Sequence, residues 1–161
     1  MSEDARSFWD WAVQAYGGEG VSEACLGLQD DHGLSVPLLL WAAWCAHTGR
    51  HPDAETIEAA ADLASNWEAA IIGPVRALRR RLKQRLLDVD DAVREDIRAD
   101  IKAVELKAEA GLIGALEVLA PAPAGTPERS IALMVAVASH SARALPRPAL
   151  QNLADRLWAA R

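Results

Sequence analysis

Cysteine is scarce in this chain, and its scarcity excludes several classes of protein. The two cysteines, Cys25 and Cys45, both lie in apolar helical patterns, and no Cys-x-x-Cys pair accompanies them. A disulfide scaffold or a zinc ribbon needs more cysteines at closer spacings. No signal peptide is recognisable at the N-terminus, so we expect reduced thiols and a cytoplasmic location. No established metal or cofactor motif is present, so we expect neither a metal nor a cofactor.

Positive charge and long apolar runs are also limited. Lys and Arg number 17 against 23 Asp and Glu, which disfavours nucleic acid and anionic membranes as partners. The apolar run from Val36 to Ala46 is far shorter than the roughly 20 residues that span a bilayer. We therefore expect no membrane span and interpret this run as a buried apolar helix, residues 36–47.

Runs of β-branched residues are absent as well, whereas alanine and leucine are frequent. At 161 residues, the chain is long enough to bury one core of its own. The composition predicts an all-α fold over residues 1–161, a single-domain helical bundle of about six or seven helices.

Three helices are expected before residue 50. Ser2 or Asp4 can cap the first, which carries five apolar residues at helical spacing: Phe8, Trp9, Ala12, Val13 and Tyr16. Ser22 is expected to cap the second helix, and Gly33 to end it. Ser35 then caps the buried helix.

A long antiparallel helical hairpin is expected over residues 66–119. One apolar stripe leads into it: Leu63, Trp67, Ile71, Val75, Leu78, Leu82 and Leu86. A second stripe follows the caps Asp90 and Asp91: Val93, Ile97, Ile101, Val104, Ala108 and Leu112. The matching stripes are expected to pack together. At Gly73–Pro74 a kinked but continuous helix is favoured, with a break as the alternative.

The remaining chain begins with a proline-rich loop. Thr126 is expected to cap a helix from Glu128 to about Ala144. A last amphipathic helix follows, with four apolar positions: Leu150, Leu153, Leu157 and Trp158.

Several motifs give the chain a family resemblance. They are FWDWAVQAY from Phe8, GVSEACLGLQDDHG from Gly20, LLLWAAW from Leu38, PVRALRRRLK from Pro74 and IKAVELKAE from Ile101. Together they resemble the domain of unknown function 2390, a family of conserved hypothetical proteobacterial proteins. The resemblance covers the chain up to about Ala120. The family has no assigned activity, so the resemblance implies a fold unit and no chemistry.

Glu105 is the most informative single residue, because it falls on the apolar face of its helix, with Glu109 one turn on. A buried carboxylate must be paired, hydrogen-bonded or protonated. If Glu105 meets the polar cluster from Gln29 to His32, then Asp30, His32, Glu105 and Glu109 could form a catalytic or metal-ligating set. A structural polar contact is the favoured alternative.

Two further groups of residues are candidates for binding. Gln29, Trp41, Trp44 and Trp67 could line a pocket for a ligand, although tryptophans at helical spacing usually belong to the core. Arg76, Arg80 and Lys83, on the side of the hairpin opposite the first stripe, could bind an acidic partner. A solvated or internally paired face is the favoured alternative.

Three functions are therefore open. The favoured one is a non-enzymatic cytoplasmic helical module that binds a protein or small ligand, with a homodimer through the long hairpin as one form of it. The alternatives are an enzyme, metal-dependent or acid–base, that uses the carboxylate and histidine set, and a carrier of an apolar small molecule in a tryptophan-lined pocket.

Overall fold

The computed structural model describes residues 7–159, and every regular element in that range is helical. The elements are α1 (Phe8–Tyr16), α2 (Val21–His32), α3 (Val36–His47), α4 (Ala54–Trp67), the π-helical segment η2 (Glu68–Ile72), α5 (Gly73–Arg81), α6 (Asp91–Leu119), α7 (Ala132–Ala138) and α8 (Arg147–Ala159). Because α4, η2 and α5 follow one another without interruption, they form one long helix. The described residues thus form an all-α bundle of seven separate helices, as predicted.

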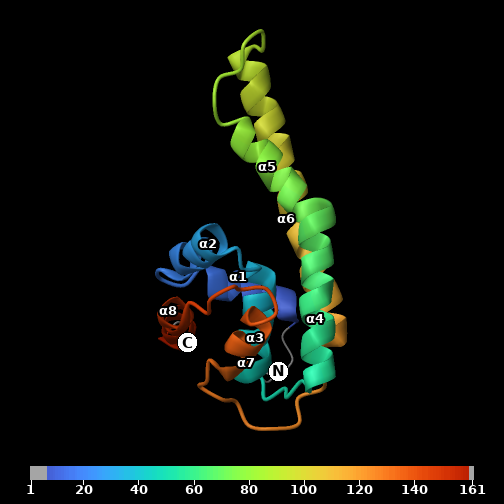
Figure 1. Cartoon of the computed structure of the whole chain (residues 1–161), viewed down its shortest axis with the longest axis vertical. Coiled ribbons are helices and arrows are strands. Elements are labelled where there is room, and N and C mark those ends of the chain that lie inside the picture. Colours follow the sequence, from blue (N-terminus) through green and yellow to red (C-terminus); the bar gives the residue numbers. More distant parts are fainter. Residues whose placement is uncertain (1–6, 160–161) are drawn as a thin grey trace.

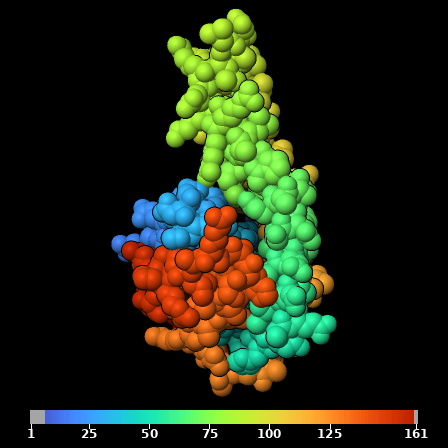
Figure 2. Space-filling model, in the orientation of Figure 1, coloured from blue at the N-terminus to red at the C-terminus, as the bar shows by residue number. Residues whose placement is uncertain are grey.

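The molecule has a body and a projecting arm (Figure 1). In the body, α1, α2, α3, α7 and α8 lie to one side of α4 and the later part of α6. The arm consists of α5, the first half of α6 and the connecting residues 82–90. Figure 2 shows the arm standing clear of the body. Among residues 7–159, no helix is both long and apolar enough to cross a membrane.

The buried apolar helix is α3, as predicted. Ser35 caps it by accepting a hydrogen bond from the backbone N–H of Leu38 at 3.4 Å. Trp41 and Trp44 are fully enclosed. Phe8 stacks on Trp44 with ring centroids 5.1 Å apart, and the Arg50 guanidinium lies 4.3 Å from a Trp44 ring centroid. The α3 helix is therefore covered on every side, as its lack of a polar face requires.

The caps of the first two helices differ in part from expectation. Ser2 and Asp4 lie outside the described residues, and Ser7 caps α1 by accepting from the backbone N–H of Asp10 at 3.1 Å. Ser22 does not cap α2, because the helix begins at Val21 and Gly20 occupies the cap position. Gly33 ends α2 in the left-handed conformation, as predicted.

The expected helix from Glu128 to Ala144 is wrong in its extent, because only Ala132–Ala138 is helical. Tertiary hydrogen bonds hold the preceding segment extended. The backbone N–H of Glu128 donates to the carbonyl of Ala46 at 2.9 Å, and that of Gly125 donates to Gly49 at 2.9 Å. These bonds satisfy carbonyls at and just after the end of α3, so they compete with an earlier helix start.

The long hairpin is confirmed, and the chain does not break at Gly73–Pro74. The π-helical segment η2 accommodates the proline, whose ring would clash with the carbonyl four residues back in a regular helix. The N–H of Gly73 donates to the carbonyl of Glu68, five residues earlier. A Cβ at Gly73 would lie 2.7 Å from that carbonyl oxygen, so the wide turn favours glycine here.

The π segment also changes which residues face α6. A π turn holds more residues than an α turn, so the inward-facing positions after it are shifted along the sequence. Ile72 and Arg76 are buried, whereas Ile71 and Leu78 are exposed. The expectation that the stripe from Leu63 to Leu86 stays on one face is therefore wrong at Ile71 and Leu78, although Leu82 is buried. Leu86 lies past the end of α5.

Two glycines of α6 offer a matched test of this packing. A Cβ at Gly111 would lie 2.8 Å from Cη2 of Trp67, whereas a Cβ at Gly114 would meet nothing within 4 Å. Gly114→Ala should raise the free energy of unfolding by about 1 kcal/mol. Gly111→Ala should lower it by about 1 kcal/mol, because overpacking costs more than the helix gains. Urea denaturation measures both values, and an equal gain in the two variants would contradict the Trp67 contact.

Candidate functional site

A cleft of about 520 Å³ opens between the body and the base of the arm. We call it the interhelical cleft. Its lining comes from α1, α2, α5, α6 and the first residues of α3, which include Val36 and Pro37. Its lining residues are Trp9, Ala12, Val13, Tyr16, Leu26, Gln29, Val36, Pro37, Leu40, Arg79, Lys102, Glu105, Leu106, Glu109 and Ile113. Apolar side chains thus form most of the wall, and charged groups are confined to α5 and α6.

The apolar wall on α1 arises from an unusually wide stripe. Phe8 and Ala12 are buried in the core. Trp9 and Val13, each one residue further on, lie about 100° around the helix and remain exposed. The stripe is therefore too wide for the core to cover, and its uncovered part faces the cleft. Leu106 and Ile113 are the apolar residues that α6 contributes to the cleft.

Glu105 lies at the charged side of the cleft and is buried, as the sequence predicts. Nε of Arg79 donates to Oε2 of Glu105 at 2.5 Å, and Nε of Arg76 donates to Oε1 at 3.1 Å. Arg76 also contacts Glu68 at 2.6 Å and Glu109 at 3.6 Å. We call these five side chains the Glu105 cluster. It joins η2, α5 and α6 where the arm leaves the body.

The cluster gives its two cleft-lining carboxyl groups opposite pKa shifts. Burial acts to raise the pKa of Glu105, but hydrogen bonds and charges from Arg79 and Arg76 outweigh it and lower this pKa. Burial raises the pKa of Glu109, and the nearby charge of Glu105 raises it further. Glu105 is therefore held ionised, whereas folding disfavours the ionised form of Glu109.

The expected set of Asp30, His32, Glu105 and Glu109 is only partly brought together. Glu105 and Glu109 line the cleft with Gln29. Asp30 instead forms an ion pair with Arg80, and His32 is exposed at the end of α2, outside the cleft lining. Between residues 7 and 159, no three His, Cys, Asp or Glu side chains are grouped so that they could hold a metal ion. The four residues therefore do not form one site.

The expected ligand-binding tryptophans lie elsewhere than in the cleft. Trp41 and Trp44 are core residues, and Trp67 packs over Gly111. Gln29 does line the cleft, and the tryptophan beside it there is Trp9. The sequence did contain a signal for the cleft. The apolar stripe on the first helix is too broad to be buried completely, so part of it remains exposed at the cleft.

The expected basic face of Arg76, Arg80 and Lys83 is also not one surface. Arg76 is buried in the Glu105 cluster, because the register after η2 turns it toward α6. Arg80 is paired with Asp30, and Lys83 is exposed in the loop after α5. Arg79 was not predicted as a site residue. Its position in the cleft depends on the register of α5 after η2.

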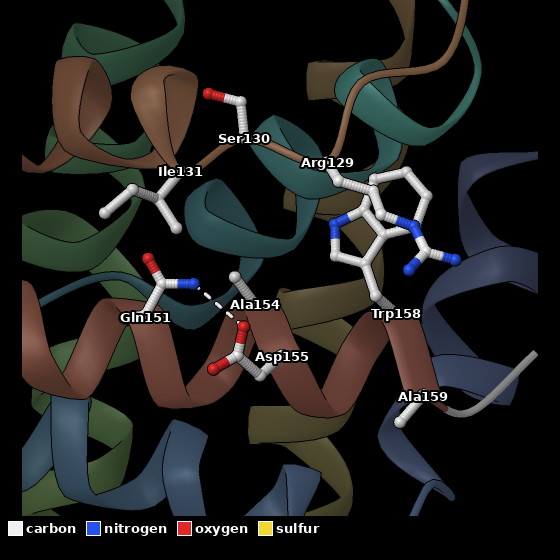
Figure 3. A pocket seen from close by; sticks show the side chains of 8 residues that line it. All are labelled: Arg129, Ser130, Ile131, Gln151, Ala154, Asp155, Trp158 and Ala159. Carbon is white, nitrogen blue, oxygen red and sulfur yellow. Dashed lines mark hydrogen bonds between the residues drawn. The ribbon is translucent and has the colours of Figure 1, made fainter.

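Two other features have less capacity for chemistry or binding. A smaller cleft of about 230 Å³ lies along α8 (Figure 3). Its polar groups already have partners, since Gln151 donates to Asp155 at 2.8 Å and Arg129 lies over Trp158 at 5.1 Å. Burial raises the pKa of the Cys25 and Cys45 thiols to about 12, so neither is a nucleophilic thiolate at neutral pH.

The Glu105 cluster predicts opposite outcomes for two similar substitutions. Glu105→Gln leaves Arg76 and Arg79 without their shared carboxylate and should lower the free energy of unfolding by roughly 3–5 kcal/mol. Glu109→Gln removes a charge that folding disfavours, so it should leave stability unchanged or slightly higher. Chemical denaturation at neutral pH measures both. Equal losses in the two variants would contradict the assigned roles.

The pKa of Glu105 also predicts a pH dependence. Because its pKa is lower in the folded state, its contribution to stability is present above the unfolded pKa of about 4.3 and is lost as pH falls through the folded value. The stability of the unaltered protein should therefore fall more steeply below pH 5 than that of Glu105→Gln. Denaturation curves between about pH 2.5 and 7 measure the two slopes, and parallel curves would refute the linkage.

Comparison with known proteins places this site within a family segment. The family model described as "Protein of unknown function (DUF2390)" matches residues 7–116. That segment contains every residue that lines the interhelical cleft. No curated protein and no solved structure matches the chain. Because the matched segment is more than half of the chain, the protein belongs to the DUF2390 family, whose function is unknown.

Proposed function

We propose that this protein is a non-enzymatic cytoplasmic helical module that binds a small amphipathic molecule in the interhelical cleft. The observation that carries the proposal is the cleft itself, in which an exposed apolar wall meets a buried charged cluster. Its volume of about 520 Å³ suits a small ligand, since ligand pockets span roughly 300–1,000 Å³.

Binding is favoured over catalysis because the carboxylates of the cleft are paired with arginines. Arg79 and Arg76 hold Glu105 ionised, and Arg76 also contacts Glu109. An acid–base enzyme remains the alternative, and its support is Glu109 alone, whose raised pKa is a feature of some general acids. The two free, buried cysteines support a reducing compartment such as the cytoplasm.

The lining residues also favour one ligand chemistry. An apolar ligand body would lie along Trp9, Val13 and Leu106, which are exposed on facing helices. Of the charged residues lining the cleft, all of which are described, Lys102 alone has no ion-pair partner. A free ammonium group at the edge of an apolar wall favours an anionic head group on the ligand.

The same module is proposed to self-associate through the long hairpin. The cleft lies on the side of the arm that is directed toward α1, α2 and α3. The opposite side of the arm is therefore available for a second contact. Binding and self-association would then use separate surfaces.

The proposal predicts selective loss of binding when the apolar wall is altered. Decanoate, a probe with an apolar chain and an anionic head, should bind the unaltered protein. Leu106→Glu should weaken this binding roughly 10-fold or more, because it removes an apolar contact from the wall. The matched control is Val118→Glu, since both residues are exposed on α6, at 55% and 84%, and only Leu106 lines the cleft. Isothermal titration calorimetry measures both.

The head-group chemistry is tested with Lys102→Gln. This variant should weaken binding of decanoate and leave binding of the uncharged analogue decanol unchanged. Equal decanoate binding by Leu106→Glu and Val118→Glu would refute the cleft as the site. Stronger binding of decylamine than of decanoate would refute the anionic head group and point to Glu109.

A further inference from the structure

The arm carries exposed apolar side chains on both of its helices. They are Ile71 in η2, Leu78 in α5, and Val93, Ile97 and Val104 in α6, each between 41% and 52% exposed. Val75, partly buried, lies between the first two. We call these six residues the outer face of the arm.

The outer face is one surface, because its residues on both helices come just before positions directed toward the other helix. On α6, Val93 precedes buried Arg94, and Val104 precedes buried Glu105. On the partner helix, Ile71 precedes buried Ile72, and Leu78 precedes Arg79, which contacts Glu105.

Antiparallel helices are related by a two-fold axis perpendicular to the plane that contains them. In both helices, the residue just before one that faces the other helix therefore lies on the same side of the hairpin.

The opposite side of the arm faces the body, which confirms the orientation of the outer face. Arg80, one residue after Arg79, forms an ion pair with Asp30 of α2. Leu106, one residue after Glu105, lines the interhelical cleft. The outer face therefore points away from α1 and α2. In the described part of the chain, its five exposed side chains keep 41% to 52% of their surface open to solvent.

The arm does not use these apolar side chains for its own interior. Its two helices meet partly through charged groups, in which Arg79 and Arg76 bind Glu105, and Nη1 of Arg94 donates to the carbonyl of Leu82. Ile72 and Leu82 are the buried apolar side chains of that contact. A helix pair that leaves an apolar flank uncovered can bury it against a second pair, as in a four-helix bundle.

We infer that the outer face is the surface through which two copies of this chain associate. The two arms would pair side by side as a four-helix bundle, with α5 of each copy over α6 of the other. This inference rests on the proposed self-association and is independent of the ligand in the cleft.

Charge complementarity selects a second copy and this arrangement. Arg81 follows Leu78 toward the tip of α5, and Asp100 lies between Ile97 and Val104 on α6. Within the described chain, neither Arg81 nor Asp100 has an ion-pair partner, nor does the neighbouring Asp96. Placing α5 over α6 of the other copy brings opposite charges together, whereas placing α5 over α5 would bring cations together.

The levels of these residues along the arm also agree. Arg81 lies between Arg79 and Leu82, whose partners on α6 are Glu105 and Arg94. Arg81 is therefore level with the α6 segment that contains Asp96 and Asp100. A two-fold axis parallel to the arm preserves this level, so each Arg81 would meet the carboxylates of the other copy.

Sedimentation equilibrium of the full chain tests the interface. The unaltered protein should be a dimer at micromolar concentration. The double variant Ile97→Glu with Val104→Glu should raise the dimer dissociation constant roughly 100-fold or more, because it places charges in the apolar interface. The control is Ala99→Glu, an exposed α6 residue outside the outer face, which should leave the constant unchanged. Circular dichroism verifies that each variant is folded.

The arrangement is tested by charge exchange. Arg81→Glu and Asp100→Lys should each weaken the dimer, and the double variant should recover much of the lost affinity. A monomeric unaltered protein, or equal dimerisation of the Ile97 and Val104 double variant, would overturn the inference. Failure of the charge exchange to restore affinity would overturn the arrangement of α5 over α6. Leu106→Glu should remain dimeric, which separates this interface from the cleft.

Discussion

The arm of this protein depends on keeping the Glu105 carboxylate ionised while it is buried. An isolated charge would be unstable there, so two guanidinium groups must be directed at it. That requirement makes the contact between α5 and α6 a charged one. It also places Arg79 and Glu109 beside the apolar wall of the interhelical cleft, where they limit the chemistry that a ligand can present.

The π-helical segment η2 supplies the register that this arrangement needs. Pro74 disfavours a regular turn before it, and the wider turn shifts the residues that follow. Arginines then face α6, and the leucine and isoleucine that a regular helix would bury are exposed. One irregular turn therefore connects the buried ion pairs, the polar side of the cleft and the apolar outer face of the arm.

Local signals in the sequence were sufficient to predict much of the fold. The caps at Ser35 and Gly33, the apolar α3 and the long hairpin follow from short-range propensities, and the structure contains all of them. The buried position of Glu105 also followed from helical periodicity. The rotation of α5 could not be predicted, because periodicity assumes a constant turn. The shortened α7 depends on hydrogen bonds to α3, which are distant in sequence. Gln29, Glu105 and Glu109 could be identified as candidates from local sequence patterns. Arg79 could not, because its position depends on the rotation of α5, and Leu106 was not identified either.

The single wide turn at η2 also makes the surface of the arm depend on how many residues that turn holds. A π turn holds about one residue more than an α turn, so deleting one residue from Glu68–Ile72 would restore a regular helix and leave the arginines facing α6. A regular helix of the present length would instead rotate everything beyond the turn by about 100°. The leucine and isoleucine side chains would then move toward Glu105, and the arginines would move to the surface. The extra residue held in one wide turn therefore decides which side chains form the interior of the arm.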